Sequence, residues 1–171
     1  MTKSEPAGDA SKKGGALGAS DPDLLAPLLE IVDQAYEAIS FEAGEQPDWT
    51  TFRSLFTERA VLALRVFPTD KHISVMNLDE YERAQLREDL AVGGYEEVPI
   101  SRSGRIIRDL GIVDVRFDMR FPNGDVVSAL DVYHLVRTAA GWRIASISSD
   151  MLEGGDAGNS AAPLEATDDA P

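Results

Sequence analysis

Residues 112–137 read IVDVRFDMRFPNGDVVSALDVYHLVR, and this stretch decides the fold. Apolar and polar side chains alternate on both sides of Asn123 and Gly124, as they do in two antiparallel strands joined by a tight turn. Alternation with a period of two is typical of a sheet that buries one face. The stretch therefore predicts a β-hairpin whose turn consists of Asn123 and Gly124.

A two-residue turn fixes which side chains share a face of the hairpin. It places Val115 opposite Val132 and Phe117 opposite Leu130. That face is almost wholly apolar, and it is predicted to point toward covering helices. The opposite face carries the charged residues of the hairpin, which are Asp114, Arg116, Asp118, Arg120 and Asp131.

Helices are predicted before the hairpin, and further strands on both sides of it. Leu25, Leu28, Val32, Tyr36 and Ile39 recur at three- and four-residue spacing after Asp21-Pro22, which indicates an amphipathic helix. Two more helices are predicted over residues 47–59 and 78–92, the latter with a capping box formed by Asn77 and Glu80. The predicted strands span residues 60–67, 95–102, 112–121, 126–137 and 142–149.

This order predicts an α+β fold with one domain. A curved, mostly antiparallel sheet would wrap around three helices of the N-terminal half as a cone-shaped α+β barrel. Residues 21–153 are predicted to form this domain. Residues 1–20 and the acidic residues 154–171 are too poor in large apolar side chains to repay the entropy of ordering, so we expect a disordered leader and a disordered tail.

The amino-acid composition of the chain argues against several classes of function. The net charge of −14 falls mostly within the predicted domain and would repel phosphate backbones and anionic lipids, so no nucleic acid or membrane partner is expected. The chain has no cysteine, which excludes thiolate nucleophiles and cysteine-ligated zinc. No secretory signal or membrane-spanning run is visible, so a cytoplasmic location is expected.

Three landmarks resemble the nuclear transport factor 2-like superfamily. They are Tyr36 in the first helix, residues 48–56 (DWTTFRSLF) and residues 141–144 (GWRI). The superfamily includes ketosteroid isomerases, scytalone dehydratase, limonene epoxide hydrolases and SnoaL-type polyketide cyclases. The resemblance implies a conical pocket, and it places Tyr36 near the hydrogen-bond-donating tyrosine of the isomerases. Leu64 stands where those isomerases carry a general-base aspartate.

Strand pairing and this resemblance together give the candidate site. His134, on the predicted inner face, is either a hydrogen-bonded core residue or a titratable pocket group. Tyr36 is a core residue, the partner of His134 or an oxyanion donor, so these two are the catalytic candidates. The candidates for binding a small apolar organic ligand are Phe56, Val115, Phe117, Met119, Ser128, Leu130, Val132, Ile147 and Ser149.

The sequence leaves three functions open. The first is a small-molecule-binding domain with an apolar conical pocket that acts as an isomerase, a dehydratase or a polyketide-cyclase-type enzyme by acid/base chemistry. The second is a non-enzymatic ligand-binding module, or a homodimer formed through an outer sheet face with Tyr133, Trp142 and Ile144. The third, implied by the resemblance, is an epoxide-hydrolase-like enzyme using Arg116, Asp118 and Asp131. No metal or cofactor is expected, because no ligand cluster or phosphate-binding glycine loop is present.

Overall fold

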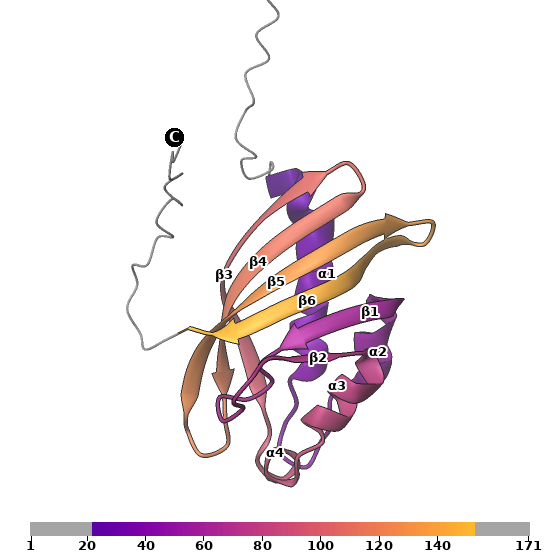
Figure 1. The fold of residues 1–171 in the computed structure, drawn as a ribbon. Coiled ribbons are helices and arrows are strands. Elements are labelled where there is room, and N and C mark those ends of the chain that lie inside the picture. The colour runs from indigo at the N-terminus through magenta and orange to yellow at the C-terminus, as the bar shows by residue number, and fades with distance from the viewer. Residues whose placement is uncertain (1–21, 153–171) are drawn as a thin grey trace, which may run out of the picture.

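The computed structural model describes residues 22–152, which form four helices and six strands (Figure 1). The predicted leader, residues 1–20, and tail, residues 154–171, lie outside the described residues. No helix within the described part is long and apolar enough to cross a membrane. The elements are α1 (Pro22–Ile39), α2 (Trp49–Ser54), β1 (Phe56–Leu64), β2 (Ser74–Met76), α3 (Leu78–Gln85), α4 (Glu88–Gly93), β3 (Glu96–Ile107), β4 (Leu110–Arg120), β5 (Val126–Thr138) and β6 (Gly141–Met151).

The six strands form one curved, open sheet in the order β2-β1-β6-β5-β4-β3. All neighbouring strands are antiparallel except β1 and β6, which run parallel. Helix α1 lies across one face of the sheet, and α2, α3 and α4 gather at one end of the molecule (Figure 1). The predicted α+β class, with a mostly antiparallel sheet curved around N-terminal helices, is confirmed.

Helix α1 packs on the sheet through the apolar stripe that its sequence predicts. Leu28, Val32, Tyr36 and Ile39 are buried at three- and four-residue spacing. The helix comes close to the sheet at Gly111 of β4, where a Cβ atom would lie 2.2 Å from Leu28 Cδ2. Glycine at this position therefore lets the helix lie close against the strand.

Two predicted helices are shorter than expected. Helix α2 ends at Ser54 because the chain enters β1 at Phe56, which pairs with Ile144 of β6. The helix expected over residues 78–92 is divided into α3 and α4 at Leu86, whose backbone leaves the helical region with φ −76° and ψ 75°. The predicted capping box of Asn77 and Glu80 at the start of α3 is confirmed.

The turn between β4 and β5 has three residues, not two. Phe121 N–H donates to the Asp125 carbonyl at 3.0 Å, and Gly124 N–H donates to the Phe121 carbonyl at 3.0 Å. Pro122 occupies the position that proline favours in a type I turn, and Gly124, with φ +87°, supplies the left-handed residue that follows such a turn. Val115 consequently lies opposite Asp131 instead of Val132, so the predicted register is wrong by one residue.

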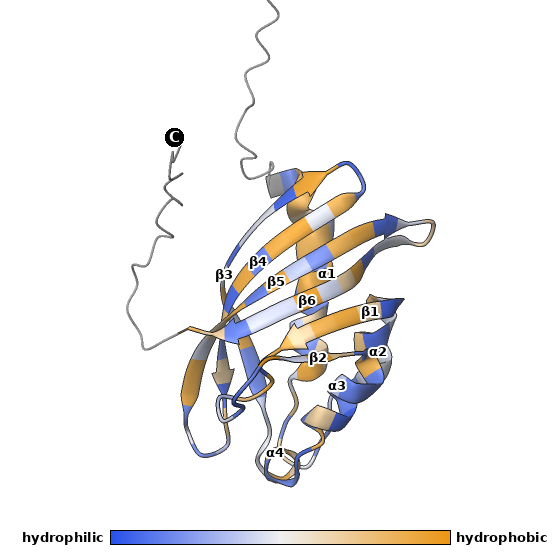
Figure 2. Ribbon diagram, in the orientation of Figure 1, coloured by the Kyte–Doolittle hydropathy of each residue, from blue (hydrophilic) through white to orange (hydrophobic). Residues whose placement is uncertain are grey.

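A shift of one residue turns every side chain of β5 to the other face of the sheet. The buried face of β4 was predicted correctly and holds Val113, Val115, Phe117 and Met119. Figure 2 shows the alternation of hydrophobic and hydrophilic residues along β4 and β5. The residues of β5 that face inward are Ala129, Asp131, Tyr133 and Leu135, whereas Ser128, Leu130, Val132 and His134 face outward.

Two irregularities change the inner faces of the neighbouring strands. In β3 the pairing with β4 shifts between Pro99 and Ser101, and Glu97 comes to lie opposite Met119. In β6 the pairing with β5 shifts between His134 and Leu135 of β5. Because of the second shift, Trp142 and Ile144 are buried in the core together with Ile147. The expectation that Tyr133, Trp142 and Ile144 form an outer face is therefore wrong.

The loop residue Gly124 offers a test of the observed register. A Cβ atom at this position would meet nothing within 4 Å. A substitution should therefore change the stability only through the positive φ of this residue. We expect Gly124→Val to lower the free energy of unfolding by about 1–2 kcal/mol, because a β-branched residue is strained at positive φ. Gly124→Asn is the matched control and should cost less, since asparagine adopts this conformation more readily. Equal losses in urea denaturation would contradict the assignment of Gly124 as the left-handed residue.

Candidate functional site

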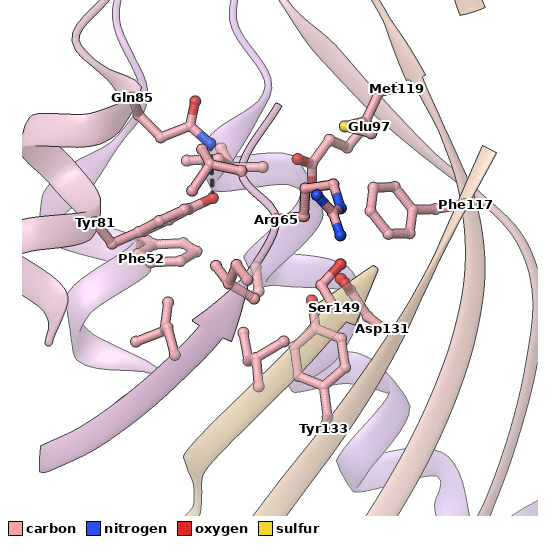
Figure 3. A pocket seen from close by; sticks show the side chains of 16 residues that line it. Phe52, Arg65, Tyr81, Gln85, Glu97, Phe117, Met119, Asp131, Tyr133 and Ser149 are labelled. Atoms are coloured by element: carbon pink, nitrogen blue, oxygen red, sulfur yellow. Dashed lines mark hydrogen bonds between the residues drawn. The ribbon is translucent and has the colours of Figure 1, made fainter. Parts of the chain in front are cut away.

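A small cavity lies between the inner face of the sheet and helices α1, α2 and α3 (Figure 3). Its volume is about 30 Å³, which is room for roughly one or two water molecules. The polar and charged side chains of its wall come from four elements, α3, β3, β5 and β6, and from the segment after β1. They are Tyr81, Gln85, Glu97, Asp131, Tyr133, Ser149 and Arg65, and the apolar wall includes Phe52, Leu62, Leu64, Phe117, Met119 and Ile147.

Asp131 is the buried carboxylate of this site. Its side chain on β5 is only 5% exposed, and its Oδ2 accepts a hydrogen bond from the Tyr36 hydroxyl of α1 at 2.7 Å. Burial raises the pKa of Asp131 to about 6, because leaving water disfavours the charged form. Hydrogen bonds from Ser149, Tyr36 and Tyr133 stabilise the carboxylate and limit that rise. Asp131 therefore titrates closer to neutrality than an ordinary aspartate.

Glu97 is a second carboxyl group in the same cavity. The Tyr95 hydroxyl donates to Glu97 Oε1 at 2.7 Å, and the backbone N–H of Glu97 donates to Ser40 Oγ at 3.0 Å. Burial, followed by repulsion from Asp131, raises the pKa of Glu97 to about 8. The hydrogen bond from Tyr95 acts in the opposite direction. Near neutral pH the cavity thus combines one mostly ionised and one mostly protonated carboxyl group.

Aromatic rings hold Tyr36 in position. Its ring centroid lies 5.3 Å from that of Phe117 and 6.0 Å from that of Tyr133. Burial is the main reason why the pKa of Tyr36 is raised above its ordinary value, so the phenol stays protonated and donates to Asp131. The packing and the hydrogen bond together fix the orientation of the Asp131 carboxylate.

Helix α3 contributes a polar pair to the opposite wall (Figure 3). Gln85 Nε2 donates to the Tyr81 hydroxyl at 2.9 Å, across one turn of the helix. Gln85 is only 4% exposed, yet its Oε1 has no hydrogen-bond partner among the residues that the structure describes. A buried acceptor without a hydrogen-bond partner lowers the stability of a folded protein. In a native structure such a group indicates a water molecule or a ligand as the partner.

Arg65 is the one basic side chain among the residues that line the cavity within residues 22–152. Its Nε donates to Asp150 Oδ1 at 2.6 Å, and its Nη1 donates to the Asp70 carbonyl at 2.6 Å. The Arg65 side chain is 23% exposed to solvent. Arg65 therefore marks the side where the cavity approaches solvent, and its hydrogen bonds are directed to groups outside the cavity wall.

The structure brings together only part of the candidate site. Five candidates lie at the cavity or against it: Phe117, Met119, Ile147 and Ser149 line it, and Tyr36 binds Asp131. Phe56 and Val115 are buried in the core but are not part of the cavity wall. The remaining candidates, which are Ser128, Leu130, Val132 and His134, lie on the outer face because of the register of β5.

The outward-facing candidates have partners of their own on that face. His134 is half-buried, and its Nδ1 lies 3.2 Å from Ser146 Oγ. The Ser128 hydroxyl donates to Asp118 Oδ1 at 2.6 Å. His134 therefore lies on the opposite side of the sheet from Tyr36 and does not form a pair with it.

The epoxide-hydrolase constellation is divided by the sheet. Arg116 and Asp118 lie on the outer face, whereas Asp131 lies on the inner face. Asp131, which the sequence placed on the charged outer face, therefore lines the cavity on the inner face. The three residues do not assemble as that alternative requires.

Sequence reasoning missed Glu97, Tyr81, Gln85 and Arg65. Tyr95 and Glu97 are two residues apart and so share a face, but an uninterrupted pairing of β3 with β4 would place Val98 opposite Met119. The proline at residue 99 is a signal for an irregular edge strand and could have indicated the shift. Tyr81 and Gln85 are four residues apart on a predicted helix, but nothing in the sequence showed which way they face.

No group of three or more His, Asp and Glu side chains within residues 22–152 is arranged to hold a metal ion.

Comparison with known proteins identifies the fold. No family model and no curated protein sequence matches the chain. A nuclear transport factor 2-like protein of unknown function from Silicibacter pomeroyi is 15% identical, with a TM-score of 0.52 over 76% of this chain and 97% of that one. A protein provisionally assigned as a ketosteroid isomerase from Shewanella frigidimarina is 17% identical, with a TM-score of 0.53 over 71% and 92%. The calcium/calmodulin kinase II hub of S. rosetta is 13% identical, with a TM-score of 0.57 over 74% and 95%.

These similarities define the class. The chain has the nuclear transport factor 2-like fold, as its sequence landmarks predicted. At such low identities the similarity concerns the fold alone.

The raised pKa of Glu97 gives a pH-dependent test of the site. The unfolded chain releases this proton above about pH 4.5, whereas the folded protein keeps it up to about pH 8, so ionisation of Glu97 costs stability as the pH rises through this interval. Glu97→Gln removes that cost. We expect the variant to gain free energy of unfolding relative to the wild type as the pH rises from about 4.5 to about 8.

Denaturation in urea at several pH values measures this difference. Glu96→Gln is the matched control, because Glu96 is an exposed neighbour that pairs with Arg120 at 3.0 Å. A constant difference between Glu97→Gln and the wild type over the whole interval would show that Glu97 is not held protonated by burial.

Proposed function

We propose that the cavity is the site of a cofactor-free enzyme in which Asp131 transfers a proton to or from a small organic molecule. The observation that carries this proposal is the 2.7 Å hydrogen bond from Tyr36 to the buried Asp131 at the edge of a cavity. A general base acts best when its pKa lies near the working pH, and burial moves Asp131 in that direction.

The surroundings of Asp131 support a role in proton transfer rather than in stability. Hydrogen bonds from Tyr36, Tyr133 and Ser149 orient the carboxylate. The Tyr81 hydroxyl in the cavity wall accepts from Gln85, which leaves its own O–H suited to stabilise negative charge that develops on a substrate oxygen. Proton abstraction next to a carbonyl group needs this combination of a base and hydrogen-bond donors. Isomerisation, dehydration and aldol-type cyclisation all begin with such a step.

The size of the cavity restricts how a substrate would bind. A volume of about 30 Å³ accommodates the reacting group of a molecule but not a whole ring system. The remainder of a larger substrate would extend past Arg65, where the wall is partly exposed. The alternative function is a non-enzymatic module that only binds a ligand in the same cavity. It would differ from the proposed enzyme in showing no turnover.

Exchange of carbon-bound hydrogen for solvent deuterium tests for the base without knowledge of the natural substrate. Acetone in D₂O, followed by proton NMR, is small and exchanges only when a proton is removed next to its carbonyl group. We expect the wild type to accelerate the exchange and Asp131→Asn to lose this acceleration by about 100-fold or more. The rate should rise as the pH increases through about 6, because Asp131 acts in its ionised form.

Asp118→Asn serves as the control for the exchange reaction. Asp118 lies on the outer face of the sheet and accepts a hydrogen bond from Ser128, so its loss should leave the rate within about two-fold of the wild type. An unaccelerated exchange, or equal losses in Asp118→Asn and Asp131→Asn, would contradict the proposal.

We also propose that two copies of the chain associate through the outer sheet face. Leu130 on this face is 37% exposed and Val126 is 57% exposed. Arg116 and Asp118 lie on the same face of β4, so a two-fold symmetric partner would present each charge to its opposite.

Substitution at Leu130 tests this association. We expect Leu130→Glu to convert a dimer into a monomer, as measured by light scattering after size-exclusion chromatography, because a carboxylate would be buried at the interface. Val75→Glu, at an exposed aliphatic residue on edge strand β2, is the control and should leave the mass unchanged. A monomeric wild type would overturn the proposed dimer.

A further inference from the structure

A second, larger hollow lies at one end of the molecule, between the segment after β1, the start of α4 and the turn that joins β4 to β5. Its volume is about 270 Å³, against about 30 Å³ for the cavity. Most of its wall is apolar and consists of Phe67, Pro68, Phe121, Pro122 and Val127. The hollow therefore has the size and the lining of a site for a small apolar group.

Strand pairing places this hollow next to the cavity. Met119 lines the cavity, whereas Val127, its partner on β5, lines the hollow. Paired residues of neighbouring strands present their side chains on the same face of a sheet. Val66 and Phe67 are consecutive in the chain, and the first lines the cavity while the second lines the hollow. Met119 lies toward the end of the cavity that is away from Tyr133 (Figure 3). The two spaces are therefore neighbours on the inner face of the sheet.

Two flat groups are held rigidly in the wall of the hollow. The guanidinium of Arg87 lies over the ring of Phe67, with its Cζ 4.3 Å from the ring centroid. Asp89 accepts hydrogen bonds from Arg87 Nε at 3.0 Å and from Nη2 at 2.8 Å. The backbone N–H of Phe67 donates to Asp70 Oδ2 at 3.0 Å, which fixes the chain at this ring. An aromatic ring suits such a wall better than an aliphatic group, because it packs on flat groups and its face attracts a cation.

We propose that the hollow binds an aromatic ring of the substrate while a carbonyl group of the same molecule lies in the cavity beside Asp131. Asp131 and Val127 are four residues apart on β5, which corresponds to about 13 Å along a strand. A ring joined to a carbonyl group by a short alkyl chain covers this distance once the contacts at both ends are included. The inference names the substrate class, aryl-alkyl carbonyl compounds, and so rests on the proposed function.

Met119 is the side chain that makes room for the alkyl chain of such a molecule. It is buried between the two spaces, and its unbranched thioether adapts to a new neighbour by changing rotamers. The alkyl chain is thin, so the ring itself never has to enter the cavity. A cavity of about 30 Å³ thus agrees with a substrate that keeps its bulk in the hollow.

Ketones that differ only in the ring test the inference on the full chain. 4-Phenylbutan-2-one and butan-2-one carry the same methyl ketone, and proton NMR in D₂O follows the deuterium exchange of that methyl group. We expect kcat/KM for 4-phenylbutan-2-one to be higher by about tenfold or more, mainly through a lower KM, because the ring is buried on binding. 4-Cyclohexylbutan-2-one has a saturated ring of similar size, and its kcat/KM should be lower than that of the phenyl compound by about threefold or more.

Two variants assign the preference for the phenyl compound to the hollow. Thr69 is exposed and lines the hollow, so the side chain introduced by Thr69→Trp would occupy the space of the ring. We expect this variant to lower the ratio of kcat/KM for 4-phenylbutan-2-one to that for butan-2-one by about tenfold. Thr50→Trp, at an exposed threonine of α2 that lines neither space, is the matched control and should keep the ratio within about two-fold. Circular dichroism confirms that both variants are folded before their rates are compared.

The outcomes separate this inference from the proposed function. Equal kcat/KM for 4-phenylbutan-2-one and butan-2-one, or an unchanged ratio in Thr69→Trp, would overturn the ring site, whereas acetone exchange that depends on Asp131 would still support the enzyme. Equal kcat/KM for the phenyl and cyclohexyl compounds would overturn an aromatic ring as the recognised group. Binding of 4-phenylbutan-2-one that ligand-observed NMR detects and that Thr69→Trp abolishes, without exchange of any ketone, would overturn the enzyme and support the hollow as a ring site.

Discussion

The three-residue loop formed by Pro122, Asn123 and Gly124 is the constraint on which the site depends. Its length sets the register of β4 against β5, and the period of two in a strand converts that register into a choice of face. With one residue fewer in the turn, Leu130 and Val132 would face α1 and Asp131 would face outward. The observed turn instead directs Asp131 at Tyr36, which α1 brings to the same place. A local turn thus determines the chemistry of the interior.

Burying carboxyl groups opposes stability, and the protein compensates for the two groups differently. Asp131 remains mostly ionised near neutral pH because hydroxyl groups from Tyr36, Tyr133 and Ser149 replace water around it. Glu97 has Tyr95 as its hydroxyl donor and avoids the cost by keeping its proton. An apolar side chain of similar size at either position would reduce the stability of the fold less than a buried carboxyl group does. Retaining two coupled acids in a small cavity is therefore better explained by function than by folding.

The sequence predicted elements whose signal is local and missed features that depend on register. The stripe of α1, the capping box of α3 and the buried face of β4 follow from spacing within one segment. The length of the turn does not follow from such spacing. Asn123-Gly124 fits a two-residue loop, and it also fits the end of the three-residue loop that begins with Pro122. Asp131 was consequently placed outside and His134 inside. Glu97 depended on a further irregularity in β3, and Gln85 on the way α3 docks, and neither leaves a periodic signal in its own segment.

The two carboxyl groups come from strands that differ in how firmly they are held. Asp131 lies on β5, which pairs on both sides with β4 and β6, whereas Glu97 lies on β3, which pairs only with β4 and is the edge of the sheet. The shift next to Pro99 gives this part of β3 fewer regular ladder bonds. The separation of the two acids, and with it their mutual repulsion, is therefore set by the less constrained strand.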